Sequence, residues 1–280
     1  MKVVIAKDAG YCFGVRDAVN LAYDTAQKFD HVYMLGDIVH NESVVKDLSA
    51  AGAKVVERLE DVPKNKKILF RAHGTKPKVW EKAKKEGKDI IDATCPLVHE
   101  IHREVKKLDN EGRRIIIIGD HGHDEVMGIA AQVDKAIIIA NPDEAKKLSK
   151  AGLKKAGVVT QSTQMIENVQ MIINILMTKV YDLRFVNTIC FPTKRNHEQI
   201  KELATKYDVV IIIGSFTSAN SKRLAKLSKT INSRTYQVRC ADEIKNGWFR
   251  NVSSVGISAG ASTPDYLIKD VAEKIKKIRE

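Results

Sequence analysis

The sequence lacks any long hydrophobic run: no stretch of its 280 residues approaches the roughly 18 apolar residues of a membrane-spanning helix. Its beginning, MKVVIAKDAGYC, reaches charge and glycine too early for the apolar region of a signal peptide. Aromatic residues make up only 6%, and no zinc-finger spacing, basic arm or aromatic RNA-binding signature occurs. These absences predict a cytoplasmic protein with neither a membrane nor a nucleic acid as partner.

Cysteine is also scarce. The chain has four cysteines and no CxxC pair, which removes the local signatures of a zinc ribbon and of a ferredoxin. A disulfide framework is not expected in a reducing compartment. Any site that several cysteines share must therefore be assembled from distant parts of the chain.

Charge is plentiful and unbalanced. With 44% hydrophobic and 29% charged residues the composition is that of an ordinary globular protein, and its net charge of +12 favours anionic partners. The basic residues lie in helix-like runs such as KVWEKAKKEGK, which are typical of solvated helix faces. A small phosphorylated substrate fits this charge as well as a nucleic acid does.

A repeat relates three of the cysteines. Each follows a short strand pattern and precedes a helix-like run, and 24 residues later each repeat reaches a glycine at the end of an apolar strand. The cysteines are Cys12, Cys95 and Cys190, and the glycines are Gly36, Gly119 and Gly214. Four residues past each glycine stand His40, His123 and Ser218, and two further on stand Glu42, Glu125 and Asn220.

A second strand–loop–helix element follows in every repeat. Its loops carry His73, Ser162 with Thr163, and Ser262. Before this element, each repeat has another helix-like run, ESVVKDLSAAG, EVMGIAAQV or SKRLAKLSK, and Asn41, Asp124 and Asn220 are the predicted N-caps of these helices. Pro77 and Pro264 are predicted to occupy early helical positions, where a missing N–H costs nothing.

Each repeat reads helix–strand–helix–strand–short turn–strand–helix–strand, and the last strand delivers the next cysteine. The third repeat lacks that strand, which the N-terminal KVVIAK can supply. The sequence thus predicts an α/β protein of three small, pseudo-threefold-related domains with mostly parallel sheets. Their expected bounds are 13–94, 95–189, and 190–280 plus 1–12. Ligands bind at the carboxyl ends of such strands, so these ends are expected to face one common cavity.

Three cysteines without a fourth cysteine fit two kinds of metal centre. One is a zinc ion held with one histidine, and the other is an iron–sulfur cluster with one open iron. Threefold geometry favours the cluster, while inert buried cysteines remain the third reading. Cys240 falls outside the repeat and is interpreted as structural, as are His31, His99, His102 and His197. The histidines and hydroxyls fixed by the repeat look like a cradle for a diphosphate: His40, His73, His123, Ser218, Asn220 and Ser262.

These motifs resemble those of the hydroxymethylbutenyl diphosphate reductases, the LytB family, over almost the whole chain. The matching stretches are GYCFGVRDAV, GDIVHNE, RAHG, DATCP, GHDEV, TQST, NTIC, SANS and AGASTPD. The resemblance implies a trefoil of three α/β domains around a central four-iron four-sulfur [4Fe-4S] cluster. Its ligands would be Cys12, Cys95 and Cys190, with one iron left open.

The implied reaction is the reductive dehydroxylation of an allylic alcohol diphosphate to isopentenyl and dimethylallyl diphosphates, with a ferredoxin or flavodoxin as electron donor. The six cradle residues would bind the diphosphate together with positions Ser162, Thr163 and Ala219. Glu125 would deliver protons, and the hydroxyl of Ser162 would relay them.

The sequence departs from the family at three places. Ser162 stands where many members have threonine, and Ala219 stands where many have a second serine. After Cys190 the run FPTKRN replaces a commoner acidic version. The competing hypotheses are a zinc-dependent hydrolase of a phosphorylated substrate and a basic, nucleic-acid-associated iron–sulfur protein.

Overall fold

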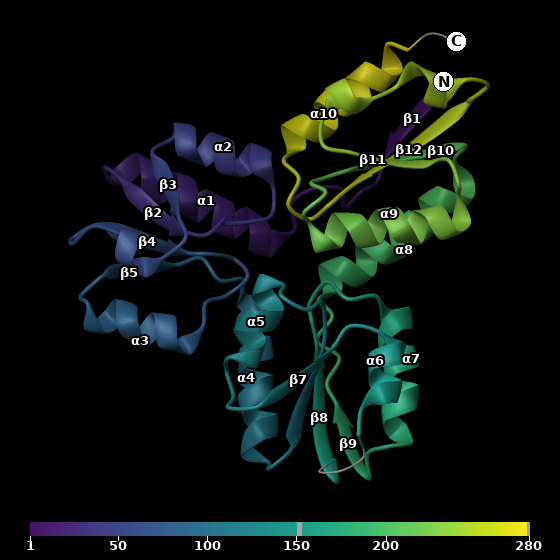
Figure 1. The fold of residues 1–280 in the computed structure, drawn as a ribbon. Helices are drawn as coiled ribbons and strands as arrows, with labels where there is room; N and C mark the ends of the chain where they lie inside the picture. The colour runs from purple at the N-terminus through teal and green to yellow at the C-terminus, as the bar shows by residue number, and fades with distance from the viewer. Residues whose placement is uncertain (150–152, 279–280) are drawn as a thin grey trace. The chain divides into compact units, whose positions relative to one another are not determined.

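The computed structural model describes residues 1–149 and 153–278, and these residues form three four-stranded sheets in which all paired strands are parallel (Figure 1). One sheet has the order β3-β2-β4-β5, from β2 (Val32–Leu35), β3 (Ala53–Val56), β4 (Lys67–Phe70) and β5 (Asp89–Asp92). The next has the order β7-β6-β8-β9, from β6 (Arg114–Ile118), β7 (Ala136–Ile139), β8 (Lys155–Thr160) and β9 (Asp182–Phe185). The last has the order β11-β10-β12-β1, from β10 (Val209–Ile213), β11 (Thr235–Val238), β12 (Ser254–Ala259) and β1 (Lys2–Ile5).

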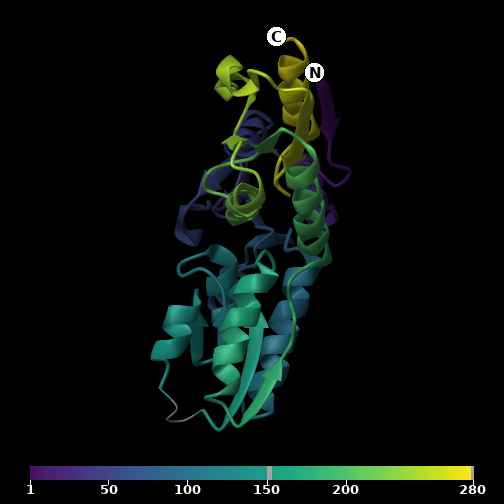
Figure 2. The ribbon, with the colours of Figure 1, turned by 90° about the vertical axis from the view of Figure 1, so that its right-hand side faces the viewer.

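The strands therefore follow the same order in all three sheets, and β1 takes the edge position that β5 and β9 hold in the other two. β1 pairs with β12 from Lys2 against Ser254 to Ile5 against Ile257. Figures 1 and 2 show β1 beside the C-terminal helix α10 (Asp265–Lys276). The prediction that the N-terminal strand completes the third repeat is confirmed, as is the α/β fold of three parallel-sheet units.

The helices follow the predicted repeat. Those of the first repeat are α1 (Phe13–Lys28), α2 (Glu42–Ala50) and α3 (Pro77–Lys85). The second has α4 (Pro96–Asn110), α5 (Asp124–Ala130), α6 (Pro142–Lys147) and α7 (Ile166–Met177), and the third has α8 (Phe191–Lys206), α9 (Ala219–Ile231) and α10. The helix-like run DYLIKDVAEKIKKIRE at residues 265–280 predicts α10, and the last two residues of this prediction lie outside the described part of the chain.

One element of the predicted repeat is wrong. The connections between β3 and β4, β7 and β8, and β11 and β12 are not short turns, because they contain the 3₁₀ helix Leu59–Asp61, the helix α6, and the 3₁₀ helices Ala241–Glu243 and Asn246–Phe249. The two strands that each connection joins are parallel and do not pair with each other, because a third strand lies between them in the sheet. This middle strand is β2 between β3 and β4, β6 between β7 and β8, and β10 between β11 and β12. A chain that must return to the same end of a sheet needs a crossover rather than a turn.

The central strands are apolar because helices cover both faces of each sheet. In β6 the alternate residues Ile116 and Ile118 pack with α7, whereas Ile115 and Ile117 pack with residues of α4 and α5. Such two-sided burial gives continuous runs of β-branched residues instead of an alternating pattern. Among the described residues, no helix is long and apolar enough to cross a bilayer.

The chain folds as two compact units. The first unit comprises 1–19, 39–47 and 191–280, and the second comprises 20–38 and 48–190. The first unit contains the sheet with β1, and the second contains the other two sheets. The three-domain bounds expected from the sequence stay a prediction.

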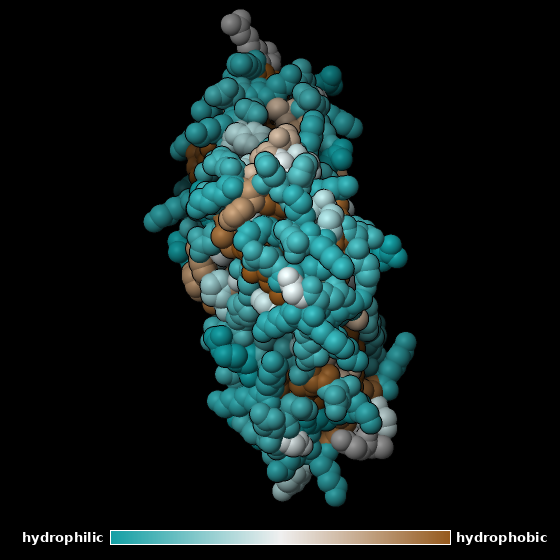
Figure 3. Space-filling view, turned by 90° about the vertical axis from the view of Figure 1, so that its left-hand side faces the viewer, coloured by the Kyte–Doolittle hydropathy of each residue, from teal (hydrophilic) through white to brown (hydrophobic). Residues whose placement is uncertain are grey.

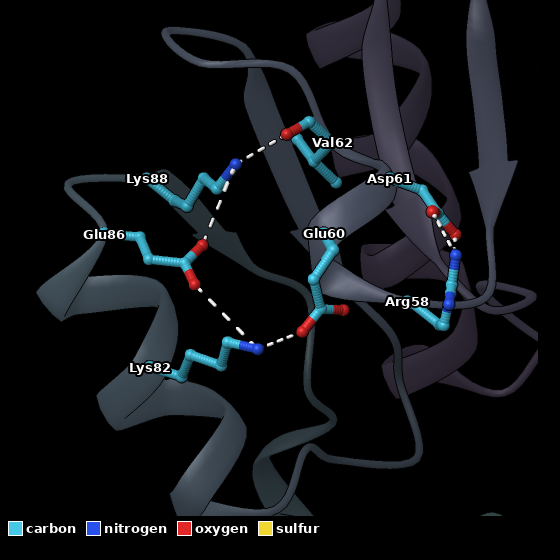
Figure 4. Close-up of polar contacts among 7 residues, drawn as sticks. All are labelled: Arg58, Glu60, Asp61, Val62, Lys82, Glu86 and Lys88. Atoms are coloured by element: carbon cyan, nitrogen blue, oxygen red, sulfur yellow. Dashed lines mark hydrogen bonds and ion pairs between the residues drawn. The ribbon is translucent and has the colours of Figure 1, made fainter.

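Charged side chains cover the helices, as the composition predicts. On the face drawn in Figure 3 hydrophilic side chains predominate. Figure 4 shows Lys82 and Lys88 on either side of Glu86, where Lys82 also pairs with Glu60 and the Lys88 ammonium donates to the Val62 carbonyl at 2.5 Å. These contacts tie the connection between β3 and β4 to α3 and to the residue before β5.

Two isoleucines of the same sheet provide a test of this packing. Ile211 in β10 is fully buried in the core of the first unit, whereas Ile5 in β1 is 42% exposed. We expect Ile211→Ala to lower the free energy of unfolding by about 2–5 kcal/mol, because it leaves a cavity in the core that β10 shares with α10. Ile5→Ala is the matched control and should cost under about 1 kcal/mol. Equal losses in urea unfolding would contradict the burial of Ile211 in this core.

Candidate functional site

The backbone of each repeat cysteine is fixed in the same way. The amide of Cys12 donates to the Ala261 carbonyl at 3.3 Å, that of Cys95 to the Ala72 carbonyl at 3.0 Å, and that of Cys190 to the Ser162 carbonyl at 2.9 Å. Each acceptor is the second residue after its strand, which is β12, β4 or β8. The repeat seen in the sequence is thus a repeat of hydrogen bonds at the carboxyl ends of strands.

The three thiols are suited to metal binding by their position at helix starts. Cys12 directly precedes α1, Cys95 is the N-cap of α4, and Cys190 directly precedes α8. Helix N-termini favour the thiolate, which is the form that binds metal. Burial raises the pKa of the Cys12 thiol, and the N–H groups of Val15 and Gly14 oppose this rise. All four cysteines lie in the described part of the chain, and none forms a disulfide.

In the first unit, Ser218 and Asn220 lie at the start of α9. Ser218 is the N-cap and accepts from the Ser221 amide at 3.3 Å. Asn220 is only 5% exposed, yet among the described residues neither its Nδ2 nor its Oδ1 has a hydrogen-bond partner. An unsatisfied buried amide costs roughly 1–3 kcal/mol. A bound ligand could supply the missing hydrogen-bond partner of this amide.

Two glycines let this helix start approach the sheet closely. A Cβ at Gly214, which follows β10, would lie 2.3 Å from the Ser221 Oγ, and a Cβ at Gly260, which follows β12, would lie 2.1 Å from it. No other residue type fits without movement, so the first turn of α9 sits directly against the carboxyl ends of β10 and β12. Backbone N–H groups at such a turn attract anions.

Two further predicted residues of the first unit are in contact. The Ser262 hydroxyl donates to the His40 carbonyl at 3.2 Å. Next to His40, Asn41 accepts from the Ser43 and Val44 amides and caps α2 as predicted. Ala219, the third predicted position around α9, is buried.

In the second unit, Glu125 and Ser162 form a closed pair. Glu125 is 2% exposed, its Oε1 accepts from the Ser162 amide at 2.6 Å, and its Oε2 accepts from the Ser162 hydroxyl at 2.8 Å. Because the Ser162 carbonyl accepts from the amide of Cys190, one residue connects the carboxylate to the backbone of a cysteine. This arrangement can hold a proton beside a hydroxyl in a site shielded from water.

The histidines of the second unit lie beside this pair. The imidazole rings of His73 and His123 are 5.8 Å apart, with their planes at 85°. The His123 Nδ1 accepts from the Glu125 amide at 3.2 Å, so this histidine is the N-cap of α5. With Nδ1 acting as an acceptor, the Nε2 of His123 can carry a proton and donate it to an anion.

Two predicted helix caps are wrong. Asp124 begins α5 and pairs with Arg71 instead of capping, and Asn220 lies inside α9, two residues after the true cap Ser218. In both cases the residue four positions past the repeat glycine makes the cap. The Asp124 side chain pairs with Arg71, whereas the Asn220 side chain has no hydrogen-bond partner among the described residues. Pro77 is the first residue of α3 as predicted, whereas Pro264 is the N-cap of α10.

The structure also refines the repeat register. The Ser162 carbonyl is equivalent to those of Ala72 and Ala261, so Thr163 and not Ser162 corresponds to His73 and Ser262. Only the second repeat carries a hydroxyl at the alanine position. The Thr163 hydroxyl accepts from the Gln161 side chain at 3.1 Å.

Sequence reasoning missed the ion pair between Arg71 and Asp124, whose atoms are 2.6 Å apart. Arg71 also lies against Gly36, where a Cβ would be 2.8 Å from its Nη1 and where φ is +74°. Arg71 lies in the motif RAHG and Asp124 in the motif GHDEV, and both motifs belong to one predicted site. Their opposite charges could therefore have predicted the ion pair. The pair joins the loop after β4 to the start of α5.

The predicted residues divide between the two units. Cys12, His40, Ser218, Ala219, Asn220 and Ser262 belong to the first, and His73, Cys95, His123, Glu125, Ser162, Thr163 and Cys190 belong to the second. The prediction that all of them line one cavity stays a prediction.

Comparison with known proteins identifies the relatives of this chain. The family model described as LytB protein matches residues 3–276. The chain belongs to the LytB family. Curated relatives from Geotalea uraniireducens and Geobacter sulfurreducens, both named 4-hydroxy-3-methylbut-2-enyl diphosphate reductase, are 39% and 37% identical. Those alignments cover 100% and 99% of this chain and 99% and 98% of the relatives.

Two solved structures of diphosphate reductases match nearly the whole of this chain. The E-1-hydroxy-2-methyl-but-2-enyl-4-diphosphate reductase from Plasmodium falciparum matches with a TM-score of 0.92 and 29% identity, over 98% of this chain and 87% of that chain. A structure titled (E)-4-hydroxy-3-methyl-but-2-enyl diphosphate reductase, the terminal enzyme of the non-mevalonate pathway, matches with a TM-score of 0.72 and 36% identity, over 99% of this chain and 100% of that chain.

A buried histidine beside this site gives a pH-dependent test. His102 on α4 is 8% exposed and lies against Gly74, and burial, with smaller effects from His99 and Lys106, lowers its pKa from 6.5 to about 4. The unfolded chain then takes up a proton below pH 6.5, while the folded protein resists it until about pH 4. We expect His102 to remove about 2–3 kcal/mol of stability as the pH falls through this window.

The measurement is urea unfolding at pH 6.5 and pH 4.5. His102→Gln should lose less stability on acidification than the unchanged protein, whereas His31→Gln, at an exposed turn, should lose the same amount. A His102→Gln variant with the original pH dependence would show that folding does not lower the pKa of this imidazole.

Proposed function

We propose that this protein reduces 4-hydroxy-3-methylbut-2-enyl diphosphate to isopentenyl and dimethylallyl diphosphates. Two electrons and two protons enter, the allylic C–O bond breaks, and the hydroxyl leaves as water. LytB membership supports the proposal, as does the name that full-length curated relatives carry. A cytoplasmic location is part of it, because a reducing compartment keeps thiol ligands intact.

The observation that carries the proposal is the buried connection from Glu125 through Ser162 to Cys190. A leaving hydroxyl must be protonated, and a carboxyl group hydrogen-bonded to a serine hydroxyl can supply that proton. When Glu125 is protonated at Oε2, it would donate to the Ser162 Oγ, and the hydroxyl of Ser162 would give its own proton to the substrate oxygen. Because Glu125 is almost completely buried, water does not compete for the proton.

The proposed cofactor is a [4Fe-4S] cluster with Cys12, Cys95 and Cys190 as ligands. Their thiols at helix starts and their equivalent backbone positions fit three equivalent ligands. When bound, such a cluster supplies electrons one at a time and an iron with an open coordination position. Cys240, which packs against the core of the first unit, is not a ligand in this proposal.

The diphosphate is proposed to bind to His40, His73, His123, Ser218, Asn220 and Ser262. The unsatisfied amide of Asn220 supports this most directly, since its Nδ2 would donate to a phosphate oxygen. Thr163 would contribute its hydroxyl, which already accepts from Gln161. Ala219 has no side-chain donor, so its backbone N–H at the first turn of α9 would take the place of a serine hydroxyl.

The cluster ligands are tested by single replacement with serine. Anaerobically purified protein should be brown and contain iron and sulfide, whereas Cys12→Ser, Cys95→Ser and Cys190→Ser should each lose most of both. Cys240→Ser is the matched control and should keep them. Colourless protein that contains zinc would instead indicate the hydrolase alternative, and iron loss in Cys240→Ser alone would refute the ligand assignment.

Glu125→Gln tests the proton donor. Glutamine can accept from the Ser162 amide with its oxygen and donate to the Ser162 hydroxyl with its NH₂ group, so the fold and cluster should persist. It cannot release a proton, and we expect turnover to fall about 100-fold or more, with substrate binding retained. Steady-state kinetics with an anaerobic reductant, together with iron content, measure both effects.

The control for Glu125 is Glu42→Gln, because Glu42 holds the equivalent position in the first repeat and accepts from the Ser215 hydroxyl at 2.7 Å. Its turnover should stay near normal. Ser162→Ala should slow the reaction less than Glu125→Gln, since water can replace a relay hydroxyl. Equal losses of turnover in Glu42→Gln and Glu125→Gln would contradict a special role of Glu125 as the proton donor.

A further inference from the structure

Two aromatic rings form an exposed pair in the first unit. Phe13 and Phe191 stack with ring centroids 5.5 Å apart and planes at 6°, although they are 38% and 53% exposed. They begin α1 and α8, and each directly follows a repeat cysteine in the sequence. Phe191 opens the run FPTKRN, whose role the proposed reaction leaves unexplained.

A cleft of about 280 Å³ lies beside this pair. Cys12 contributes to its wall, together with both phenylalanines, Tyr11 and Pro192. The cleft therefore runs from open surface to a cysteine that we propose as a cluster ligand. The rings already stack on each other at contact distance, so no planar cofactor fits between them.

The charged residues around this cleft are mainly basic. Its walls include Lys7, Arg16 and Arg195 but one acidic residue, Asp8. Asp8 accepts from Arg195 at 2.8 Å and from the Gln199 side chain, so its charge is already matched. Arg16 lies over the Tyr11 ring at 5.6 Å, and its 3.7 Å pair with the exposed Asp265 is loose. An excess of positive charge therefore remains.

Exposed aromatic anchors with a charged rim are typical of protein interfaces: the rings supply contact energy, and the rim steers a partner of opposite charge. We infer that this aromatic cleft, formed by Phe13, Phe191 and the basic residues around them, is the docking surface for an acidic one-electron carrier protein. The inference rests on the proposed function, because it assumes an iron–sulfur cluster at Cys12. The carrier would seat its own redox centre over the cleft and pass electrons toward Cys12, one in each encounter.

The test follows cluster reduction by stopped-flow absorbance in the anaerobic holoenzyme with two reductants. One is an acidic two-iron ferredoxin in its reduced form, and the other is reduced methyl viologen, a small cation. Phe191→Asp, and the double variant Lys7→Glu with Arg16→Glu, should lower the second-order rate constant with ferredoxin about tenfold or more. Reduction by viologen should not slow in either variant. Raising the salt concentration should slow the unchanged enzyme with ferredoxin alone.

Matched controls lie elsewhere on the surface. Tyr181→Asp changes another exposed aromatic residue, and Lys226→Glu reverses an exposed charge on α9. Both should react with ferredoxin at the original rate. Iron content and thermal stability of all variants show that each is folded and loaded.

Each remaining outcome is informative. Equal ferredoxin rates in the cleft variants and controls would overturn the docking surface while viologen still reduces the cluster. A raised KM for the diphosphate substrate in the cleft variants, with viologen as donor, would identify the cleft as a substrate entrance and overturn the carrier assignment. If viologen reduces no iron–sulfur chromophore even in the unchanged protein, the proposed function itself fails.

Discussion

The amide of each repeat cysteine donates to a carbonyl just past the end of the neighbouring strand, and the candidate site depends on these three hydrogen bonds. The bond fixes the cysteine at the carboxyl edge of a parallel sheet and sets the start of the following helix. Because a backbone bond does not depend on the side chain of the acceptor, the frame leaves that residue free to vary. The acceptor is alanine in the first and third repeats, at Ala72 and Ala261, and serine in the second, at Ser162.

The residue six positions after each repeat glycine also differs in its contacts from one repeat to the next. The first offers Glu42 paired with Ser215, the second offers Glu125 paired with Ser162, and the third offers Asn220 with no partner among the described residues. A carboxylate holding a hydroxyl suits proton transfer, and an unpaired amide suits an anion. Equivalent places thus carry a carboxylate in the first two repeats and an amide in the third.

The proposed site concentrates the unfavourable features of the fold. Within the described part of the chain, the Asn220 amide and the Ser221 hydroxyl are buried without a hydrogen-bond partner, and two phenylalanine rings remain exposed beside Cys12. Each costs stability unless a ligand, helix packing or a partner compensates for it. Elsewhere the central strands are buried on both faces by β-branched residues, and this ordinary core stabilises the exceptions.

The sequence by itself determined the threefold repeat, the α/β class and the use of the N-terminal strand to complete a sheet. These features follow from local periodicity and from regular spacing, which the linear chain displays. Tertiary structure decided that Ser162 and not Thr163 sits over Glu125, that His123 and Ser218 cap their helices, and that Arg71 pairs with Asp124. It also decided that Phe13 meets Phe191. Each of these contacts depends on which side chains two distant segments of the chain bring together. Residue spacing within one segment carries no information about how the other segment is rotated or how closely it approaches.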